Sequence, residues 1–231
     1  FKKQGQRQIL NHQGEQLLPL AKQMLKDNDA ILQLFSNETI TGKVRLGIPS
    51  EFAASILPAI IGDFVSLYPD VSLEVKSELS KQLMHVSNRD EFDLVLTLVE
   101  QLDNPHYPSF LQDDLVWVGN TPAKLTEPVT LVVAPQGCIY RRRAIEALEQ
   151  AGVSWRIVYT NADLTGLTAA IKEQLGVTVL ARKTVPEELP YTANSDVLPA
   201  LGQVGISLIK RGQESLQAID KLAEFITLRL S

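Results

Sequence analysis

The chain has 231 residues, of which 45% are hydrophobic and 21% charged, as in a globular protein with one large or two small domains. Its net charge of −5 argues against nucleic-acid binding through the body of the chain. One cysteine, Cys138, excludes an internal disulfide, and three scattered histidines show no metal-ligand spacing, so we expect no cofactor and no metal. Neither a membrane-length apolar run nor a secretory signal is present, so we expect no membrane partner and a cytoplasmic location.

The start of the chain has the character of a segment from a longer protein. Phe1 stands where a complete chain would have Met, which suggests that an N-terminal part is missing. Residues 1–11 are basic and give few structural signals. Asn11 is a candidate N-cap for the helix that follows.

A helix over residues 17–35 carries apolar side chains at three- and four-residue steps. This heptad row consists of the apolar Leu17, Ala21, Met24, Ile31 and Phe35, with the polar Asn28 filling its one gap. A lone helix with such a row needs a partner to bury it, which is either its own domain or a second copy of the chain. Because residues 36–42 look like a loop that separates the helix from the rest, we favour a dimer.

Residues 42–75 predict a strand–helix–strand unit. The first strand covers 43–48 and ends at Pro49, a helix runs from Ser50 at its N-cap to about Tyr68, and a second strand covers 71–75. The helix starts at the carboxyl end of a strand, where free N–H groups suit an anionic or carbonyl ligand. The alternative, a serine that only caps the helix, is the commoner role of such a residue.

The remainder alternates between strand and helix signals at short spacing. We expect strands at 92–98, 115–119, 129–134, 156–160, 177–181 and 205–210, and helices at 80–87, 140–151, 164–175 and 214–230. This alternation predicts an α/β fold. We expect two α/β subdomains joined by two crossing strands and preceded by the long helix: residues 1–41, then subdomain I from 42–118 plus 205–231, and subdomain II from 119–204.

A cleft between two such subdomains is a favoured place for a small-molecule site. Polar residues follow several predicted strands at their carboxyl ends, where an open parallel sheet leaves its crevice. The candidate effector-binding residues are Ser50, Glu51, Thr97, Gly137, Cys138, Ile139, Tyr140, Thr160 and Asn161. Free N–H groups after Ser50 favour a carboxylate or carbonyl, whereas Glu51 would repel an anion unless it turns to solvent. We therefore expect a small polar or weakly acidic metabolite.

The sequence gives little evidence for a catalytic site. His12, His85 and His106 accompany no motif that places a nucleophile or an orienting acid, so we expect no enzyme and no catalytic residue. Cys138 is either a redox-sensing thiol or, as the commoner case, a small residue in a turn. Arg141–Arg143 is either an anion clamp or, more often for such runs, a solvated basic turn.

A second dimer surface is expected on the helix that follows Ser50. Ile56, Ile60 and Phe64 give this helix more apolar sides than one sheet can cover. We therefore expect their outer face to contact a second copy of the chain.

Several segments, in order, resemble LysR-type transcriptional regulators. Leu10-Asn-His-Gln-Gly-Glu-Gln-Leu-Leu is similar to the start of that family's linker helix, and Gly42-Lys-Val-Arg-Leu-Gly-Ile to the start of its effector domain. Ile56-Leu-Pro, Tyr68-Pro-Asp-Val-Ser-Leu-Glu-Val and Asp93-Leu-Val-Leu follow at the family's spacing. Val153-Ser-Trp-Arg-Ile-Val-Tyr and Leu175-Gly-Val-Thr-Val are similar to the subgroup that represses motility and exoenzyme genes.

The resemblance implies a periplasmic-binding-protein-like fold of type 2, a homo-oligomer (a dimer or a tetramer) and control of transcription by a small effector. It also implies that residues 1–10 are the end of a DNA-binding wing. DNA would then be bound only by an N-terminal winged helix-turn-helix that this chain lacks. The alternative is a free-standing solute-binding protein or transporter component of the same fold, since fold does not fix function.

Overall fold

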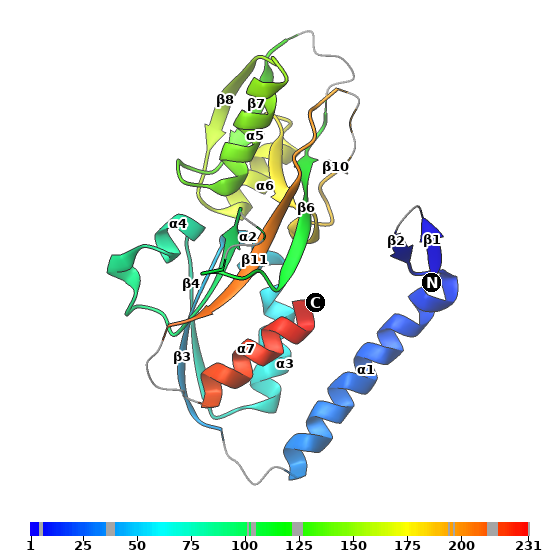
Figure 1. Cartoon of the computed structure of the whole chain (residues 1–231), viewed down its shortest axis with the longest axis vertical. Coiled ribbons are helices and arrows are strands. Elements are labelled where there is room, and N and C mark those ends of the chain that lie inside the picture. Colours follow the sequence, from blue (N-terminus) through cyan, green and yellow to red (C-terminus); the bar gives the residue numbers. More distant parts are fainter. Residues whose placement is uncertain are drawn as a thin grey trace.

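The computed structural model describes residues 1–4, 7–35, 40–100, 102, 105–121, 127–193, 195, 197–211 and 217–230. They form two α/β lobes stacked along the long axis of the molecule, with the long helix α1 (His12–Phe35) standing to one side (Figure 1). Strands β6 (Leu111–Val118) and β11 (Gln203–Lys210) pair antiparallel and run from one lobe into the other. Two lobes joined by crossing strands were predicted, and this part of the prediction is confirmed.

The lower lobe is built on parallel strands. Its elements are β3 (Gly42–Ile48), β4 (Val71–Ser77), β5 (Leu94–Val99), α2 (Ser50–Ser55), α3 (Leu57–Leu67), α4 (Ser80–Leu83), the 3-10 turn η1 (Val86–Asn88) and α7 (Gln217–Leu230). The strand order is β4-β3-β5-β11-β6-β10, with β3 parallel to β4 and to β5. Every residue of β5 is buried, because helices cover both faces of the sheet.

The upper lobe contains a second parallel pair. Its elements are β7 (Val129–Val133), α5 (Ile139–Gln150), β8 (Trp155–Thr160), α6 (Leu164–Lys172), β9 (Thr178–Ala181), the 3-10 turn η2 (Arg182–Thr184) and β10 (Tyr191–Thr192). Strands β7 and β8 are parallel, and a bridge between Leu131 and Val177 connects them to the segment that opens β9. Strand β9 in turn pairs antiparallel with β6, so the crossing strand joins both sheets.

The predicted helix from Ser50 to Tyr68 is two helices. Helix α2 ends at Ser55, and α3 begins at Leu57 with Pro58 in its first turn. Pro58 has no N–H to donate to the α2 carbonyls, so one continuous helix would lose a hydrogen bond there. Ser50 is also the first helical residue and not the cap: the carbonyl oxygen of Pro49 accepts from the N–H groups of Phe52 and Ala53.

The expected second dimer surface lies inside the molecule. Phe64 is 0% exposed and its ring lies 5.6 Å from the Phe225 ring of α7, and Ile60 is buried in the same core. Ile56 is half-buried and packs against that core. The sequence-based expectation assumed a single sheet as the only cover for α3. Helix α7 returns to the lower lobe after β11 and covers the other side.

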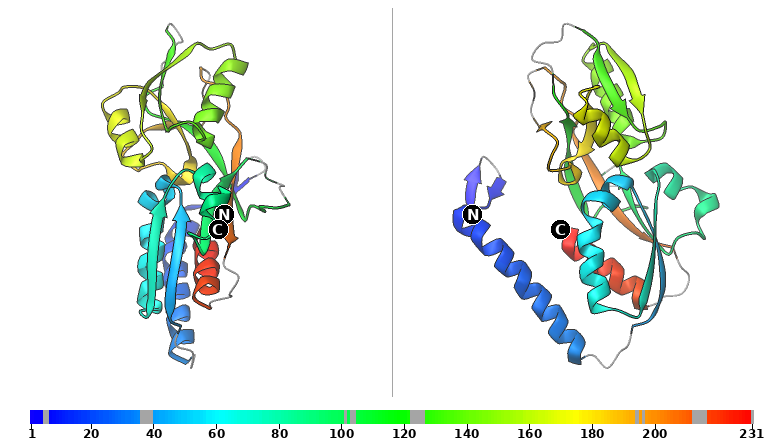
Figure 2. Two further views of the ribbon diagram at one scale, coloured as in Figure 1. Left: turned by 90° about the vertical axis from the view of Figure 1, so that its left-hand side faces the viewer. Right: turned by 180° about the vertical axis from the view of Figure 1, so that it is seen from behind.

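Helix α1 carries its heptad row on the outside. Leu17, Met24 and Ile31 are 60%, 72% and 55% exposed, and Asn28 is exposed as well. The side chain of Phe35 and most of the predicted loop at 36–42 lie outside the described residues. Figure 2 shows α1 as a rod beside the two lobes in both further views.

The start of α1 is capped as predicted, and an unpredicted hairpin precedes it. The side-chain Oδ1 of Asn11 accepts from the Gly14 N–H at 2.8 Å, which confirms Asn11 as a cap. Strands β1 (Lys2–Gln4) and β2 (Arg7–Ile9) form a two-stranded antiparallel sheet.

Side chains tie the lobes together where the strands cross. Asp114 on β6 accepts from Gln203 Nε2 on β11 at 2.7 Å and forms an ion pair with Arg182 of η2 at 2.9 Å. The Nζ of Lys183, also in η2, donates to the carbonyl of Leu230 at the end of α7 at 3.1 Å. The upper lobe is thus anchored to the last turn of the lower lobe's C-terminal helix.

Two neighbouring substitutions on α3 test its orientation. Phe64→Ala removes a fully buried ring and should lower the free energy of unfolding by about 3–5 kcal/mol. Val65→Ala, at a side chain that is 39% exposed, should lower it by less than about 1 kcal/mol. Urea unfolding followed by circular dichroism measures both. Equal effects would contradict the core position of Phe64.

Candidate functional site

A small, partly enclosed cavity (the closed cavity) lies where the two lobes meet. The lower lobe contributes α2, the segment that opens α4 and the end of β5, and the upper lobe contributes the starts of α5 and α6. Its volume is about 30 Å³, and its walls include Ser50, Glu51, Leu98, Cys138, Ile139, Tyr140 and Leu164. This is room for one water-sized group and not for a whole metabolite.

A second, open pocket adjoins the closed cavity. Ser80, Leu98, Cys138 and Ile139 are walls of both. The open pocket has a volume of about 370 Å³ and is also lined by Thr97, Gly137, Lys81, Met84 and Arg142. Small-molecule sites in proteins span roughly 300–1,000 Å³, so this pocket has the size to hold the body of a small ligand.

Seven of the nine predicted effector residues line one of these two spaces. They are Ser50, Glu51, Thr97, Gly137, Cys138, Ile139 and Tyr140. Thr160 is exposed and lines neither. Asn161 also lies outside both: its Oδ1 accepts from the Asp163 N–H at 2.9 Å, and its Nδ2 donates to Tyr159 OH at 3.0 Å. Asn161 therefore shapes the turn before α6.

Sequence reasoning missed Ser80 and Lys81, whereas Arg142 belongs to the run that was considered as an anion clamp. Ser80 and Lys81 begin α4, which follows the parallel strand β4. The same rule that selected Ser50, that ligands gather at the carboxyl ends of parallel strands, would have found them. Ser80 is buried, and its Oγ accepts from the Leu98 N–H at 3.1 Å, which fixes the end of β5 at the pocket wall.

Glu51 is the main electrostatic feature of the closed cavity. It is 7% exposed, and its Oε1 has no hydrogen-bond partner among the described residues. Burial raises its pKa from an ordinary 4.5 to about 7, while its own backbone N–H and the Tyr140 hydroxyl oppose the shift. The carboxyl group thus lies where an anionic ligand was expected to bind, and at neutral pH it is only partly ionised.

Tyr140 faces Glu51 from the upper lobe. It is buried, and its hydroxyl also makes no hydrogen bond of regular geometry with any described residue. Burial and the negative charge of Glu51 raise the pKa of this phenol well above 10, so it stays protonated. Two buried oxygen atoms that make no hydrogen bond of regular geometry with a described residue therefore lie beside each other at one cavity, in opposite lobes.

Cys138 is poorly suited to redox sensing. Burial and the neighbouring Glu51 raise the pKa of its thiol to about 11, so the reactive thiolate is scarce at neutral pH. Its half-buried side chain packs against the hydrophobic core, as for a small residue in a turn.

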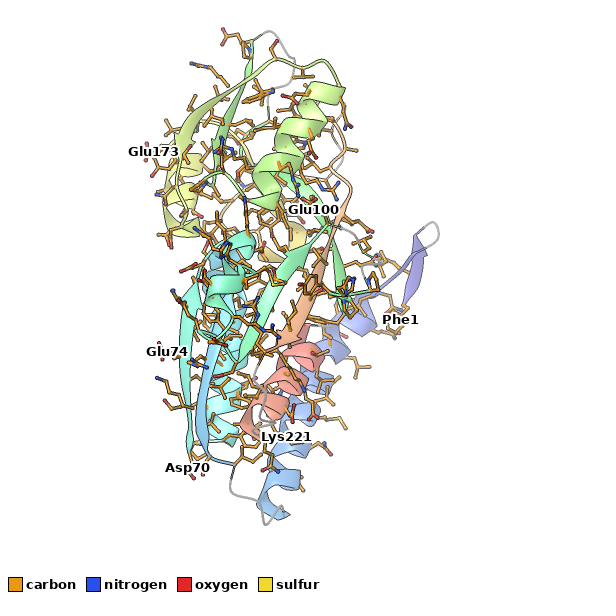
Figure 3. The ribbon with its side chains drawn as sticks, turned by 60° about the vertical axis from the view of Figure 1, so that its left-hand side comes forward. Phe1, Asp70, Glu74, Glu100, Glu173 and Lys221 are labelled. Atoms are coloured by element: carbon orange, nitrogen blue, oxygen red, sulfur yellow. The ribbon has the colours of Figure 1, made fainter. Side chains whose placement is uncertain are left out.

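The arginines of α5 do not form a common anion clamp. Arg141 Nη1 donates to the Ala134 carbonyl at 3.2 Å, and Arg143 Nη2 to the Gln203 carbonyl at 3.2 Å. Arg142 alone lines the open pocket, where it forms an ion pair with Glu100. Figure 3 shows Glu100 at the waist between the lobes.

Gly137 allows the stem of Lys81 to close one side of the open pocket. Its φ of +98° favours glycine, and a Cβ there would lie 3.0 Å from Lys81 Cδ. The stem of Lys81 therefore packs on the backbone of the upper lobe, although Lys81 belongs to the lower lobe. No ion pair of Lys81 is found among the described residues.

A larger groove of about 640 Å³ lies between α2, α6 and residues 183–188. Three of its charged side chains are used internally: Lys172 pairs with Glu188 at 3.1 Å, and the Nζ of Lys183 donates to the Leu230 carbonyl. In the described part of the chain, no group of three or more His, Cys, Asp and Glu side chains could hold a metal ion. None of the described helices has both the length and the apolar character needed to cross a membrane.

The burial of Glu51 makes stability depend on pH. Between pH 4.5 and about 7 the folded state keeps a proton that the unfolded state has lost, so the free energy of unfolding falls as pH rises. Glu51→Gln removes this loss. One pKa unit equals about 1.4 kcal/mol. The free energy of unfolding of the variant minus that of wild type should therefore be about 1–2 kcal/mol larger at pH 8.5 than at pH 6.

Chemical denaturation at both pH values measures this difference. Glu173→Gln is the matched control, because Glu173 is exposed on the upper lobe (Figure 3) and should give the same small change at both. A pH-independent effect of Glu51→Gln would contradict a buried, unpaired carboxyl.

Known proteins are similar to this chain in sequence and in architecture. The sequence model of the LysR substrate binding domain matches residues 37–226. HTH-type transcriptional regulator DgdR of Burkholderia cepacia is 27% identical over 211 residues, which cover 90% of this chain and 71% of DgdR. HTH-type transcriptional regulator PecT of Dickeya dadantii is 28% identical over 203 residues, which cover 87% of this chain and 64% of PecT. The chain thus spans about two thirds of the length of these relatives.

Among solved structures, the CcmR regulatory domain of Synechocystis PCC6803, in complex with 2-PG, superimposes with a TM-score of 0.61. The match covers 82% of this chain and 98% of that domain at 18% identity, which shows a shared fold. The predicted periplasmic-binding-protein-like fold is thereby confirmed. The relatives are transcriptional regulators, which does not support the alternative of a free-standing solute-binding protein. With its residues 37–226 matched by the family's sequence model, the chain belongs to the LysR substrate-binding domain family.

Proposed function

We propose that this chain is the effector-sensing and oligomerising part of a LysR-type DNA-binding transcriptional regulator. The observation that carries the proposal is the two-part space between the lobes, where buried polar atoms lack partners. The similarity to the transcriptional regulators DgdR and PecT supports the link to transcription. The complex of the CcmR regulatory domain with 2-PG supports ligand sensing by a domain of this fold. The function is binding and not catalysis.

The domain division follows the crossing strands. We assign residues 1–41 to the end of a DNA-binding wing and the linker helix, residues 42–118 plus 205–231 to subdomain I, and residues 119–204 to subdomain II. DNA would be contacted by an N-terminal domain that lies mostly outside this chain. The β1–β2 hairpin would be the end of the wing of that domain. Such a regulator acts in the cytoplasm.

The effector acts by favouring one arrangement of the lobes. A ligand shifts a conformational equilibrium only by the difference between its affinities for the two states. The closed cavity has walls from both lobes, so a ligand there stabilises the closed arrangement. The lobes turn about β6 and β11, and the bond between Lys183 and Leu230 carries the motion to α7.

Oligomerisation uses the exposed heptad row of α1. In water, exposed Leu17, Met24 and Ile31 favour association with a second copy of the same helix. The polar Asn28 in that row would fix the register of the pair. A dimer formed in this way, or a tetramer of two such dimers, is the assembly that we propose.

A ligand screen tests the effector site. Amino acids, carboxylic acids, sugars and nucleosides are screened by thermal shift against the wild-type chain and Ile139→Trp. Ile139 is a wall of both spaces, so a larger side chain there should weaken binding of the effector at least tenfold in calorimetry. Val86→Trp, at an exposed residue of η1, should bind like wild type. Equal affinity of Ile139→Trp and wild type would place the ligand elsewhere.

Sedimentation at micromolar concentration tests the assembly. The wild-type chain should sediment as a dimer or tetramer of the 25.5 kDa subunit, and Met24→Glu combined with Ile31→Glu should shift it toward the monomer. Val86→Glu changes an even more exposed apolar residue outside the heptad row and should leave the assembly intact. A wild-type monomer, or the same shift with Val86→Glu, would contradict a role for the heptad row.

A further inference from the structure

The closed cavity selects for hydrogen-bond donors. Glu51 Oε1 is a buried acceptor that makes no hydrogen bond of regular geometry with any described residue, and the Tyr140 hydroxyl lies beside it. The other walls of the cavity carry no charge apart from the weakly acidic Cys138. A ligand group here must be about as large as a water molecule and must donate hydrogen bonds. An ammonium group has this size, three donors and the charge that complements a carboxylate.

The open pocket has the opposite charge. Lys81 and Arg142 line it, and neither it nor the closed cavity has an acidic wall other than Glu51. Glu100 pairs with Arg142 from outside the pocket and offsets part of that charge, which leaves Lys81 as the cation without an ion pair among the described residues. Ser80 and Thr97 add hydroxyl groups. This end suits a carboxylate.

Resting on the proposed function, we infer that the effector is a small zwitterion of the amino-acid class. Its ammonium group binds Glu51 and Tyr140 in the closed cavity, and its carboxylate faces Lys81 and Arg142 in the open pocket. This polarity is the reverse of the one expected from the sequence, in which the start of the helix at Ser50 would hold an anion. The 370 Å³ of the open pocket are available to the carboxylate and the side chain.

Binding of an ammonium group is linked to pH through Glu51. An adjacent cation favours the ionised carboxylate, whose pKa without ligand is about 7, so affinity should rise about tenfold from pH 6 to pH 8. Tyr140 and Cys138 also face Glu51, and their raised pKa values keep both neutral over this range. Helix α6 and strand β9 present only apolar side chains, Leu164, Leu167 and Leu180. Lys81, Arg142 and Glu100 are the charged groups at the open end.

Calorimetry with the twenty protein amino acids tests the inference. Each one that binds is compared with the carboxylic acid that lacks its amino group and with the amine that lacks its carboxyl group. We expect at least one amino acid to bind with sub-millimolar affinity, and either analogue to bind at least tenfold more weakly. Glu51→Gln should weaken the amino acid at least tenfold, leave its des-amino analogue nearly unchanged and abolish the pH dependence.

Matched variants separate the two ends of the site. Lys81→Gln should weaken the amino acid several-fold and leave the amine analogue unchanged. Glu173→Gln and Lys221→Gln, which lie on the outer surfaces of the upper and lower lobes (Figure 3), should change neither. The inference would be overturned if Glu51→Gln bound the amino acid as tightly as wild type does. It would also be overturned if the affinity of wild type for the amino acid fell from pH 6 to pH 8.

Failure of this inference is distinguishable from failure of the proposed function. If no amino acid binds but a carboxylic acid, sugar or nucleoside binds and is lost in Ile139→Trp, the cleft is the effector site and the zwitterion is wrong. If an amino acid binds equally well to Ile139→Trp and wild type, both the site and the inference fall.

Discussion

The antiparallel pairing of β6 with β11 is the constraint on which the rest of the structure depends. It extends from Gln203 opposite Asp114 to Ile206 opposite Leu111. Strand β11 also pairs with β5 in the lower lobe, and β6 with β9 and β10 in the upper. Strand β6 therefore joins the sheet of the lower lobe, through β11, to the strands of the upper lobe. A small change of backbone dihedrals at the crossing would turn one lobe against the other without disturbing either core.

The buried carboxyl of Glu51 in the cleft lowers the stability of the protein, and the fold itself does not require a carboxyl there. A buried carboxyl without a hydrogen-bond partner is disfavoured, and the fold would tolerate an amide or apolar residue of similar size at position 51. Such groups concentrate at functional sites, where a ligand supplies the missing partner. The same reasoning separates this space from the larger groove, where Lys172, Glu188 and Lys183 already have partners within the chain.

Local patterns in the sequence were sufficient to predict the elements and their order. The alternation of apolar residues and the positions of proline and glycine located most helices and strands to within a few residues. The strands β1 and β2 have three residues each, too few for an alternation to be visible. The break between α2 and α3 was visible in Pro58, which belongs to a helix start more often than to its interior.

The environment of single side chains could not be predicted in the same way. Phe64 and Ile60 looked like surface residues because the helix that covers them, α7, comes more than 150 residues later in the chain. The burial of Glu51 depends on α5 and α6 of the opposite lobe. Thr160 and Asn161 follow a strand as predicted, but whether such residues face the cleft depends on the turn, and here Asn161 bonds to Asp163.

The exposed row on α1 also bears on how this protein folds. Most helical stability in proteins comes from packing of an apolar face, and Leu17, Met24 and Ile31 of this 24-residue helix are exposed. If its partner is a second copy of the chain, then ordering of α1 and association are a single coupled reaction. The melting temperature of α1 then rises with protein concentration, because association stabilises the ordered helix.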